Sequence, residues 1–139
     1  SEFSASYLLP QILSYEKIFL KRSNLYLRYA KNLEVLNSKN FTMTNNYKYK
    51  YNFHAFVIVL NKNIRDEFIK YLKKFNINAI IHYTPLHRSK VGRTFSINKN
   101  KLVNTDKYVN KIVRLPLHDS LTMNEVDYIS KKILEYFAR

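Results

Sequence analysis

The chain has 139 residues, of which 46% are hydrophobic, and its 24 Lys and Arg against 10 Asp and Glu give a formal net charge of +14. This length suits one domain with a single hydrophobic core. The longest apolar run, Phe56 to Leu60, is far below the ~20 residues that a membrane-spanning helix needs, which excludes such a helix and a membrane partner. One glycine and no cysteine exclude a glycine-rich phosphate loop, a cysteine nucleophile and a cysteine-ligated metal.

The positive charge has two explanations. A field of this sign would attract phosphates, nucleic acid or anionic surfaces. The chain is also crowded with Lys, Asn, Ile and Tyr, a bias that an AT-rich genome produces without selection for an anionic partner. We prefer the second explanation, so nucleic acid is not an expected partner. The start of the chain shows no secretory signal, and the lack of cysteine fits a reduced, cytoplasmic setting.

The first third of the chain is predicted to be one long helix and a loop. Apolar residues at three- or four-residue spacing predict a helix over residues 1–36, with a break near Leu9 caused by Pro10. Residues 37–52 lose this spacing and are predicted to form a surface loop. The loop interleaves Tyr47, Tyr49 and Tyr51 with lysines, as single-stranded nucleic acid binders do, but a solvated loop is the preferred interpretation.

Residues 53–139 are predicted to alternate strands with helices. Strands are expected at residues 53–60, 77–83 and 112–115, and a basic loop at 88–101. A helix is expected from Ile64 to Phe75, capped by Asn61 or Asn63, and a short helix is expected to be capped by residues 104–106. The last helix begins at Thr122-Met123-Asn124-Glu125, which matches a capping box. The fold class is therefore α/β (α+β), a two-layer sandwich of a small sheet and packed helices.

The densest polar cluster is His82-Tyr83-Thr84-Pro85-Leu86-His87-Arg88, where a predicted strand ends. Imidazole and phenol groups hydrogen-bond sugar hydroxyls, and a guanidinium pairs with phosphate, so the cluster suits a nucleotide-linked sugar. Judged alone, two such histidines are more often ordinary strand-end residues. A metal site is not expected, because no acidic residue is adjacent. His54 and His118 are interpreted as hydrogen-bonded structural histidines.

Several blocks of the sequence resemble the C-terminal part of the DegT/DnrJ/EryC1/StrS family of sugar aminotransferases. Residues 1–11 resemble the family's SELxAAxLxxQL helix, and residues 52–56 its NxHxF strand entry. Residues 82–87 resemble its HYxPLH block, with Gly92 and Phe95 at the family's spacing. Residues 114–118 and Leu121 resemble its RLPLxxxL stretch. The HYxPLH block is closest to the branch of the dTDP-4-amino-4,6-dideoxygalactose transaminases.

The resemblance implies the C-terminal small domain of a fold type I enzyme, with a mostly antiparallel sheet. Such enzymes use pyridoxal phosphate (PLP) to move an amino group from glutamate to a nucleotide-linked 4-keto-6-deoxy sugar in surface polysaccharide synthesis, usually as homodimers. It further implies that His82, Tyr83 and His87 contact substrate. Arg88 is included with them, although the family has a small residue there.

The family's Schiff-base lysine and other cofactor-binding residues belong to a preceding large domain, so no catalytic or cofactor-binding residue is assigned in this chain. The chain alone is therefore expected to be inactive and to bind no PLP. Two alternatives remain. The chain could be a stand-alone basic module that binds nucleic acid or another polyanion, or a surface left by a missing domain could mediate dimerisation or aggregation.

Overall fold

The computed structural model describes residues 1–44, 52–95 and 102–139. The Tyr and Lys alternation at residues 47–51 and the end of the predicted basic loop lie outside these residues. Within them the chain forms a four-stranded sheet, in the order β1-β2-β4-β3, with antiparallel pairing throughout. The strands are β1 (Phe41–Met43), β2 (Phe56–Leu60), β3 (Ile80–Ile81) and β4 (Ile112–Leu115). The predicted fold class and the antiparallel sheet are confirmed.

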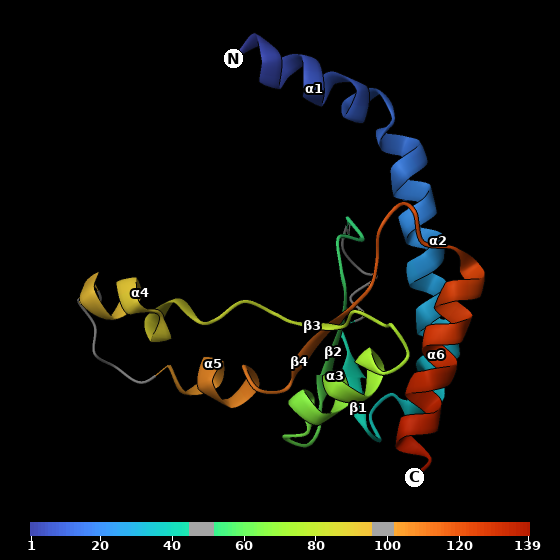
Figure 1. Ribbon diagram of the computed structural model, residues 1–139, viewed down its shortest axis with the longest axis vertical. Coiled ribbons are helices and arrows are strands. Elements are labelled where there is room, and N and C mark those ends of the chain that lie inside the picture. The colour runs from blue at the N-terminus through green and yellow to red at the C-terminus, as the bar shows by residue number, and fades with distance from the viewer. Residues whose placement is uncertain (45–51, 96–101) are drawn as a thin grey trace.

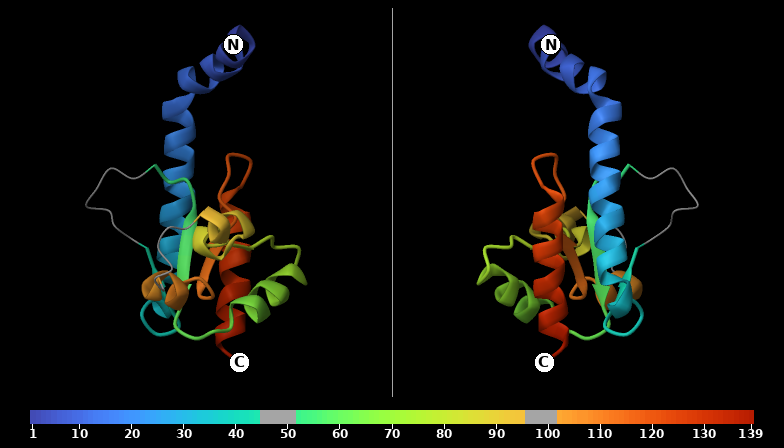
Figure 2. Two further views of the ribbon diagram at one scale, coloured as in Figure 1. Left: turned by 90° about the vertical axis from the view of Figure 1, so that its left-hand side faces the viewer. Right: turned by 90° about the vertical axis from the view of Figure 1, so that its right-hand side faces the viewer.

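Helices cover one face of this sheet. Helix α2 (Tyr15–Leu33) and helix α6 (Met123–Phe137) run side by side, and α3 (Arg65–Lys73) packs beside α6 (Figures 1 and 2). Apolar residues spaced three or four apart give each helix one buried stripe; on α6 these are Val126, Ile129 and Ile133. The stripes meet Phe56, Ile58 and Val113 of the central strands, which are fully buried.

The predicted capping box begins α6. The Thr122 hydroxyl accepts a hydrogen bond from the Glu125 N–H at 3.3 Å, and the Glu125 carboxylate accepts one from the Thr122 N–H at 2.7 Å. These two bonds satisfy N–H groups that a helix start otherwise leaves unpaired. The cap therefore fixes where α6 begins, as its sequence predicts.

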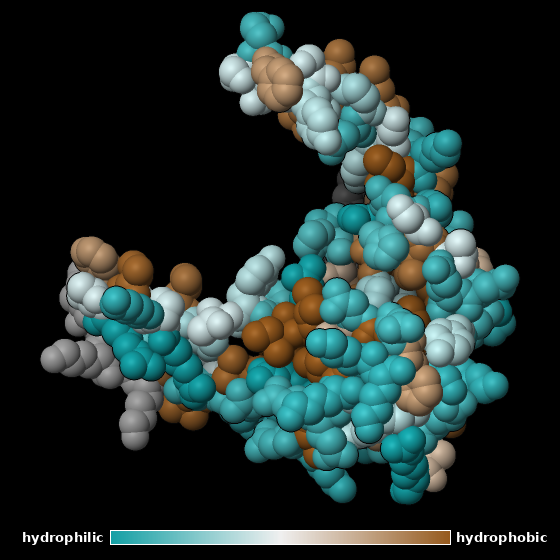
Figure 3. Space-filling view, viewed as in Figure 1, coloured by the Kyte–Doolittle hydropathy of each residue, from teal (hydrophilic) through white to brown (hydrophobic). Residues whose placement is uncertain are grey.

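The long N-terminal helix is divided at Ser14, not near Leu9. Helix α1 (Glu2–Leu13) contains Pro10 in its interior, and the Ser14 N–H donates to the Pro10 carbonyl at 3.1 Å. Proline lacks the N–H that would bond to the preceding turn and its ring crowds that turn, yet this solvent-exposed helix continues past Pro10 to Leu13. None of the residues of α1 is buried. The helix projects from the body and carries exposed apolar side chains (Figures 1 and 3).

Two short elements lie where only loops were predicted. Strand β1 falls inside the predicted loop at residues 37–52, with Phe41 and Met43 buried and Thr42 exposed. Three residues are too few to show a period in the sequence. Helix α4 (Lys90–Phe95) falls inside the predicted basic loop and follows the 3₁₀ turn η2 (Leu86–Arg88). A further 3₁₀ turn, η1 (Glu34–Leu36), follows α2.

The strands predicted at residues 53–60 and 77–83 are longer than β2 and β3, whereas the strand predicted at residues 112–115 matches β4. The caps predicted for the helix at residues 64–75 and for the short helix near residues 104–106 are wrong. Ile64 precedes α3 without a side-chain cap, whereas the Asn61 amide donates to the carbonyl oxygens of Ser38 and Lys39 at 3.1 and 3.0 Å. Helix α5 (Val103–Tyr108) follows Leu102, so the residues expected to cap it lie within the helix. No helix among the described residues is both long enough and apolar enough to span a bilayer.

Candidate functional site

The candidate site lies at the edge of the sheet face opposite the helices. Alternation along β4 buries Val113 and Leu115 and turns Ile112 and Arg114 to the other face. In the antiparallel register Arg114 is opposite Val57 on one side and Ile80 on the other, and directly opposed residues share a face. Two open pockets lie beside the row that Val57, Arg114 and Ile80 form across the sheet.

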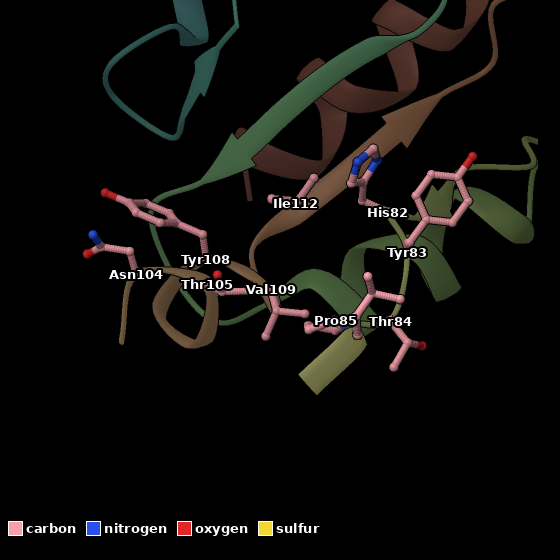
Figure 4. Close-up of a pocket in the computed structure, with 10 residues that line it drawn as sticks. His82, Tyr83, Thr84, Pro85, Asn104, Thr105, Tyr108, Val109 and Ile112 are labelled. Carbon is pink, nitrogen blue, oxygen red and sulfur yellow. The ribbon is translucent and has the colours of Figure 1, made fainter. Parts of the chain in front are cut away.

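The first pocket, of about 510 Å³, lies between the segment after β3 and helix α5. His82 and Tyr83 are at one end, and Asn104, Thr105 and Tyr108 are at the other (Figure 4). Its lining is completed by Thr84, Pro85, Leu86, Val109 and Ile112. The pocket thus joins an apolar floor to hydroxyl, phenol, amide and imidazole groups, which suits a ligand with both apolar and hydrogen-bonding parts.

His82 and Tyr83 are available to such a ligand. Their ring centroids are 5.0 Å apart, and the Tyr83 side chain is 72% exposed. The guanidinium carbon of Arg114 lies 5.7 Å from the centre of the Tyr83 ring, a distance at which a cation is attracted to the ring face. The sequence-predicted pair is therefore next to a cation of β4 that the prediction did not include.

His87 and Arg88 do not line this pocket but pair with Asp106 of α5. The His87 Nε2 lies 3.0 Å from a carboxylate oxygen of Asp106, and the Arg88 guanidinium lies 2.6 Å from the same oxygen. The hydrogen bond from His87 and the charge and hydrogen bond of Arg88 lower the pKa of Asp106. The sequence shows no acidic residue beside this histidine, and only the fold brings Asp106 to it. The contact ties η2 to α5, the two sides of the first pocket.

The second pocket, of about 250 Å³, lies on the other side of Arg114. It is lined by His54, Asn78, Arg114 and His118 together with Ala55, Ile80, Leu115, Pro116 and Leu117. Both histidines are exposed, and neither imidazole has a hydrogen-bond partner among the described residues. The described residues therefore show no imidazole hydrogen bond that would support the interpretation of these histidines as hydrogen-bonded structural residues. The alternation of β4 could have drawn attention to Arg114, an arginine within an apolar strand.

The described residues offer neither a metal site nor a buried lysine at these pockets. No group of three or more His, Asp or Glu among them could hold a metal ion. Neither the first nor the second pocket is lined by a lysine. The groups that do line the two pockets, among them imidazole, phenol, amide and guanidinium groups, can bind and orient a polar, partly anionic ligand.

Solved structures with the same fold come from several bacteria. The aminotransferase PseC of Helicobacter pylori, involved in pseudoaminic acid biosynthesis, matches with a TM-score of 0.83 and 22% identity over 94% of this chain and 35% of its own. DesV of S. venezuelae matches with a TM-score of 0.85 and 19% identity over 97% of this chain and 36% of its own. The PLP form of the putative sugar aminotransferase Spr1654 of Streptococcus pneumoniae matches with a TM-score of 0.80 and 20% identity over 94% of this chain and 34% of its own.

This chain therefore spans about a third of the length of these structures. Their identities are too low to show more than the fold, but the sequence itself matches a family model over nearly its whole length. The model of the DegT/DnrJ/EryC1/StrS aminotransferase family covers residues 1–134. The chain belongs to the DegT/DnrJ/EryC1/StrS aminotransferase family.

Proposed function

We propose that this chain is the C-terminal small domain of a PLP-dependent aminotransferase. The intact enzyme would transfer an amino group from glutamate to a nucleotide-linked 4-keto-6-deoxy sugar in surface polysaccharide synthesis. The observation that carries this proposal is the family match over residues 1–134, in a chain that spans about a third of the matched structures. A large domain then accounts for the remaining length, and a homodimer is proposed with it.

We also propose that this chain does not hold PLP by itself. PLP forms a Schiff base with a lysine and acts as an electron sink when bound, but no lysine lines the first or the second pocket, which lie on the open face of the sheet, the face opposite the helices. We place that lysine in the large domain. One matched structure is described as a PLP form, which supports the cofactor for the intact enzyme. This chain would then contribute substrate contacts, be inactive alone and bind no PLP.

His82 and Tyr83 are the proposed direct contacts to the sugar. Both line the first pocket with exposed rings that can donate or accept hydrogen bonds. His87 and Arg88 were expected to contact the substrate, but we propose a different role for them. Their pairing with Asp106 holds η2 against α5, so we assign them the role of positioning residues for the pocket walls. Arg88 is 42% exposed at its side chain, and its remaining donors can still reach a substrate phosphate.

The proposal is tested with the protein encoded by the complete reading frame that contains this sequence. Purified with PLP and supplied with glutamate and a dTDP-4-keto-6-deoxy sugar, it should form 2-oxoglutarate and a dTDP-amino sugar, detected by mass spectrometry. The 139-residue chain under the same conditions should form neither. A complete protein that releases no 2-oxoglutarate with any nucleotide-linked keto sugar would refute the proposed reaction.

A pair of tyrosine variants tests the assigned pocket. Tyr83→Phe should lower kcat/KM about 3- to 10-fold, the effect of losing one neutral hydrogen bond. The matched control is Tyr128→Phe, because Tyr128 lies on α6 outside both pockets and is 45% exposed. Equal activity of the two variants would remove Tyr83 from the substrate contacts.

A further inference from the structure

Arg114 is an arginine in an unusual place for a charge. It lies on β4, an inner strand of the sheet, between Val57 of β2 and Ile80 of β3. Its side chain is partly buried and lines the second pocket. A charge held between apolar neighbours in a sheet costs free energy unless a counter-charge or hydrogen-bond acceptors compensate it. The group that compensates Arg114 therefore indicates what this pocket binds.

Four of the six other arginines of the chain have a carboxylate partner, whereas Arg93 and Arg139 have none among the described residues. Arg22, Arg28, Arg65 and Arg88 each pair with an aspartate at 2.6–2.8 Å. Arg114 pairs with no carboxylate among the described residues, and its recorded contact is with the ring of Tyr83. The ring lies close to the guanidinium, but an aromatic face accepts no conventional hydrogen bond from the five N–H groups of an arginine. These donors remain available to a ligand.

The surroundings of Arg114 favour an anion. His54, at the entry to β2, and His118, after β4, line the same pocket, and Asn78 adds an amide. No carboxylate lines this pocket. The charge of His118 does act on Glu125, whose pKa is lowered chiefly by its hydrogen bonds to Thr122 and to a smaller degree by this charge. Glu125 is thus already engaged in the cap of α6 and does not neutralise Arg114.

We propose that the second pocket binds an anionic group of the substrate, a carboxylate or a phosphate, with Arg114 as its principal ligand and the imidazoles of His54 and His118 as further donors. A planar guanidinium binds either group through paired hydrogen bonds. The inference deepens the proposed function and rests on it for the identity of the ligand. Arg114 contacts Tyr83 of the first pocket, so one ligand can place its anionic group here and its uncharged part there.

The experiment is an NMR titration of the 139-residue chain at constant ionic strength, maintained with sodium chloride. Glutarate stands for the carboxylate of an amino acid, and inorganic pyrophosphate for the diphosphate of a nucleotide sugar. We expect one of them to cause saturable shifts of the Arg114 Nε–H and of the His54 and His118 ring signals. Saturation with glutarate alone assigns the pocket to the amino donor, and saturation with pyrophosphate alone assigns it to the sugar nucleotide.

Two variants with the same change of charge complete the test. Arg114→Gln should weaken binding at least about tenfold, as expected for a hydrogen bond to a charged group. Arg93→Gln should leave it unchanged, because Arg93 is exposed on α4 and lines neither pocket. A dispersed amide spectrum shows that each variant is folded. Equal affinities for the two variants, or no saturable shift with either probe, would overturn the inference.

The outcomes separate this inference from the proposed function. Saturable binding that depends on Arg114, together with a complete protein that has no transaminase activity, keeps the anion site and rejects the proposed reaction. Activity of the complete protein that Arg114→Gln does not change, together with no binding by this chain, keeps the reaction and rejects the anion site.

Discussion

Replacing Tyr29 by Phe tests how the long helix is joined to the sheet. Tyr29 is fully buried, its hydroxyl donates a hydrogen bond to the Pro116 carbonyl at 3.1 Å, and its ring centroid lies 4.9 Å from that of Phe56. Tyr29→Phe keeps the ring contact and removes only the hydroxyl. It leaves a carbonyl group without its partner, which should lower the free energy of unfolding by about 1–2 kcal/mol.

For a domain of this size such a loss corresponds to a fall in Tm of roughly 3–7 °C. Urea unfolding followed by circular dichroism measures the free energy, and calorimetry measures Tm. The matched control is Tyr128→Phe, which removes a hydroxyl from a side chain that is 45% exposed and should change the free energy of unfolding by less than about 0.5 kcal/mol.

Tyr29→Phe should also change how the free energy of unfolding depends on pH above about pH 10. Burial, and secondarily the charge of Glu125, raise the pKa of Tyr29 above its ordinary value of 10.0. Above about pH 10 the unfolded chain loses this proton while the folded chain keeps it, so stability falls as pH rises from there toward the raised pKa. Tyr29→Phe should lack this part of the fall. If Tyr29→Phe has the same free energy of unfolding as the wild type and the same dependence on pH, the hydrogen bond to Pro116 and the burial of Tyr29 are refuted.

Three further predictions concern other contacts. Hydrogen bonds from Arg28 and then Asn32 lower the pKa of Asp127 from 3.8 to about 2. The carboxylate therefore stabilises the folded chain above about pH 4, and this stabilisation is lost as pH falls toward 2. In Asp127→Asn, the free energy of unfolding measured in urea should depend less on pH in this range. Gly92→Ala should accelerate amide hydrogen exchange in α4 with little change in Tm, because a Cβ there would lie 1.7 Å from the Leu86 carbonyl oxygen; Thr94→Ala, which adds no such clash, is its control. Asp106→Asn should weaken the contacts to His87 and Arg88 and shift the His87 ring signals in NMR spectra, whereas Asp66→Asn should not.

The helices and the central strands could be predicted because each carries a local signal. Helix α6 has both a capping box and a buried stripe, and β2 and β4 are short apolar runs. The length of β3 and the existence of β1 depend on pairing with distant segments. Phe41 of β1, for example, pairs with Leu60 and packs near Phe137. Such contacts leave no period in the sequence.

The candidate site was predictable only in part, for a related reason. His82 and Tyr83 were identified because they are adjacent in the sequence and match a family block. Asp106 and Arg114 were not assigned to the site because they reach it from other elements, α5 and β4. Asp106 also changes the interpretation of His87 and Arg88, whose chemistry alone suggested ligand contact. A short motif indicates where a site lies, whereas the partners that decide each residue's role come from the topology.

The described residues that line the two pockets do not gather cations as a polyanion-binding site would. Such sites gather cations along one face, so that each bound phosphate releases counterions and affinity falls steeply with salt. The exposed lysines Lys21, Lys31, Lys70, Lys73 and Lys131 lie on α2, α3 and α6, the helices that cover the other face of the sheet. Among the described residues that line the two pockets of the open face, the cationic group is Arg114, with two imidazoles beside it. This arrangement suits one anionic group, and its affinity should therefore depend only weakly on salt.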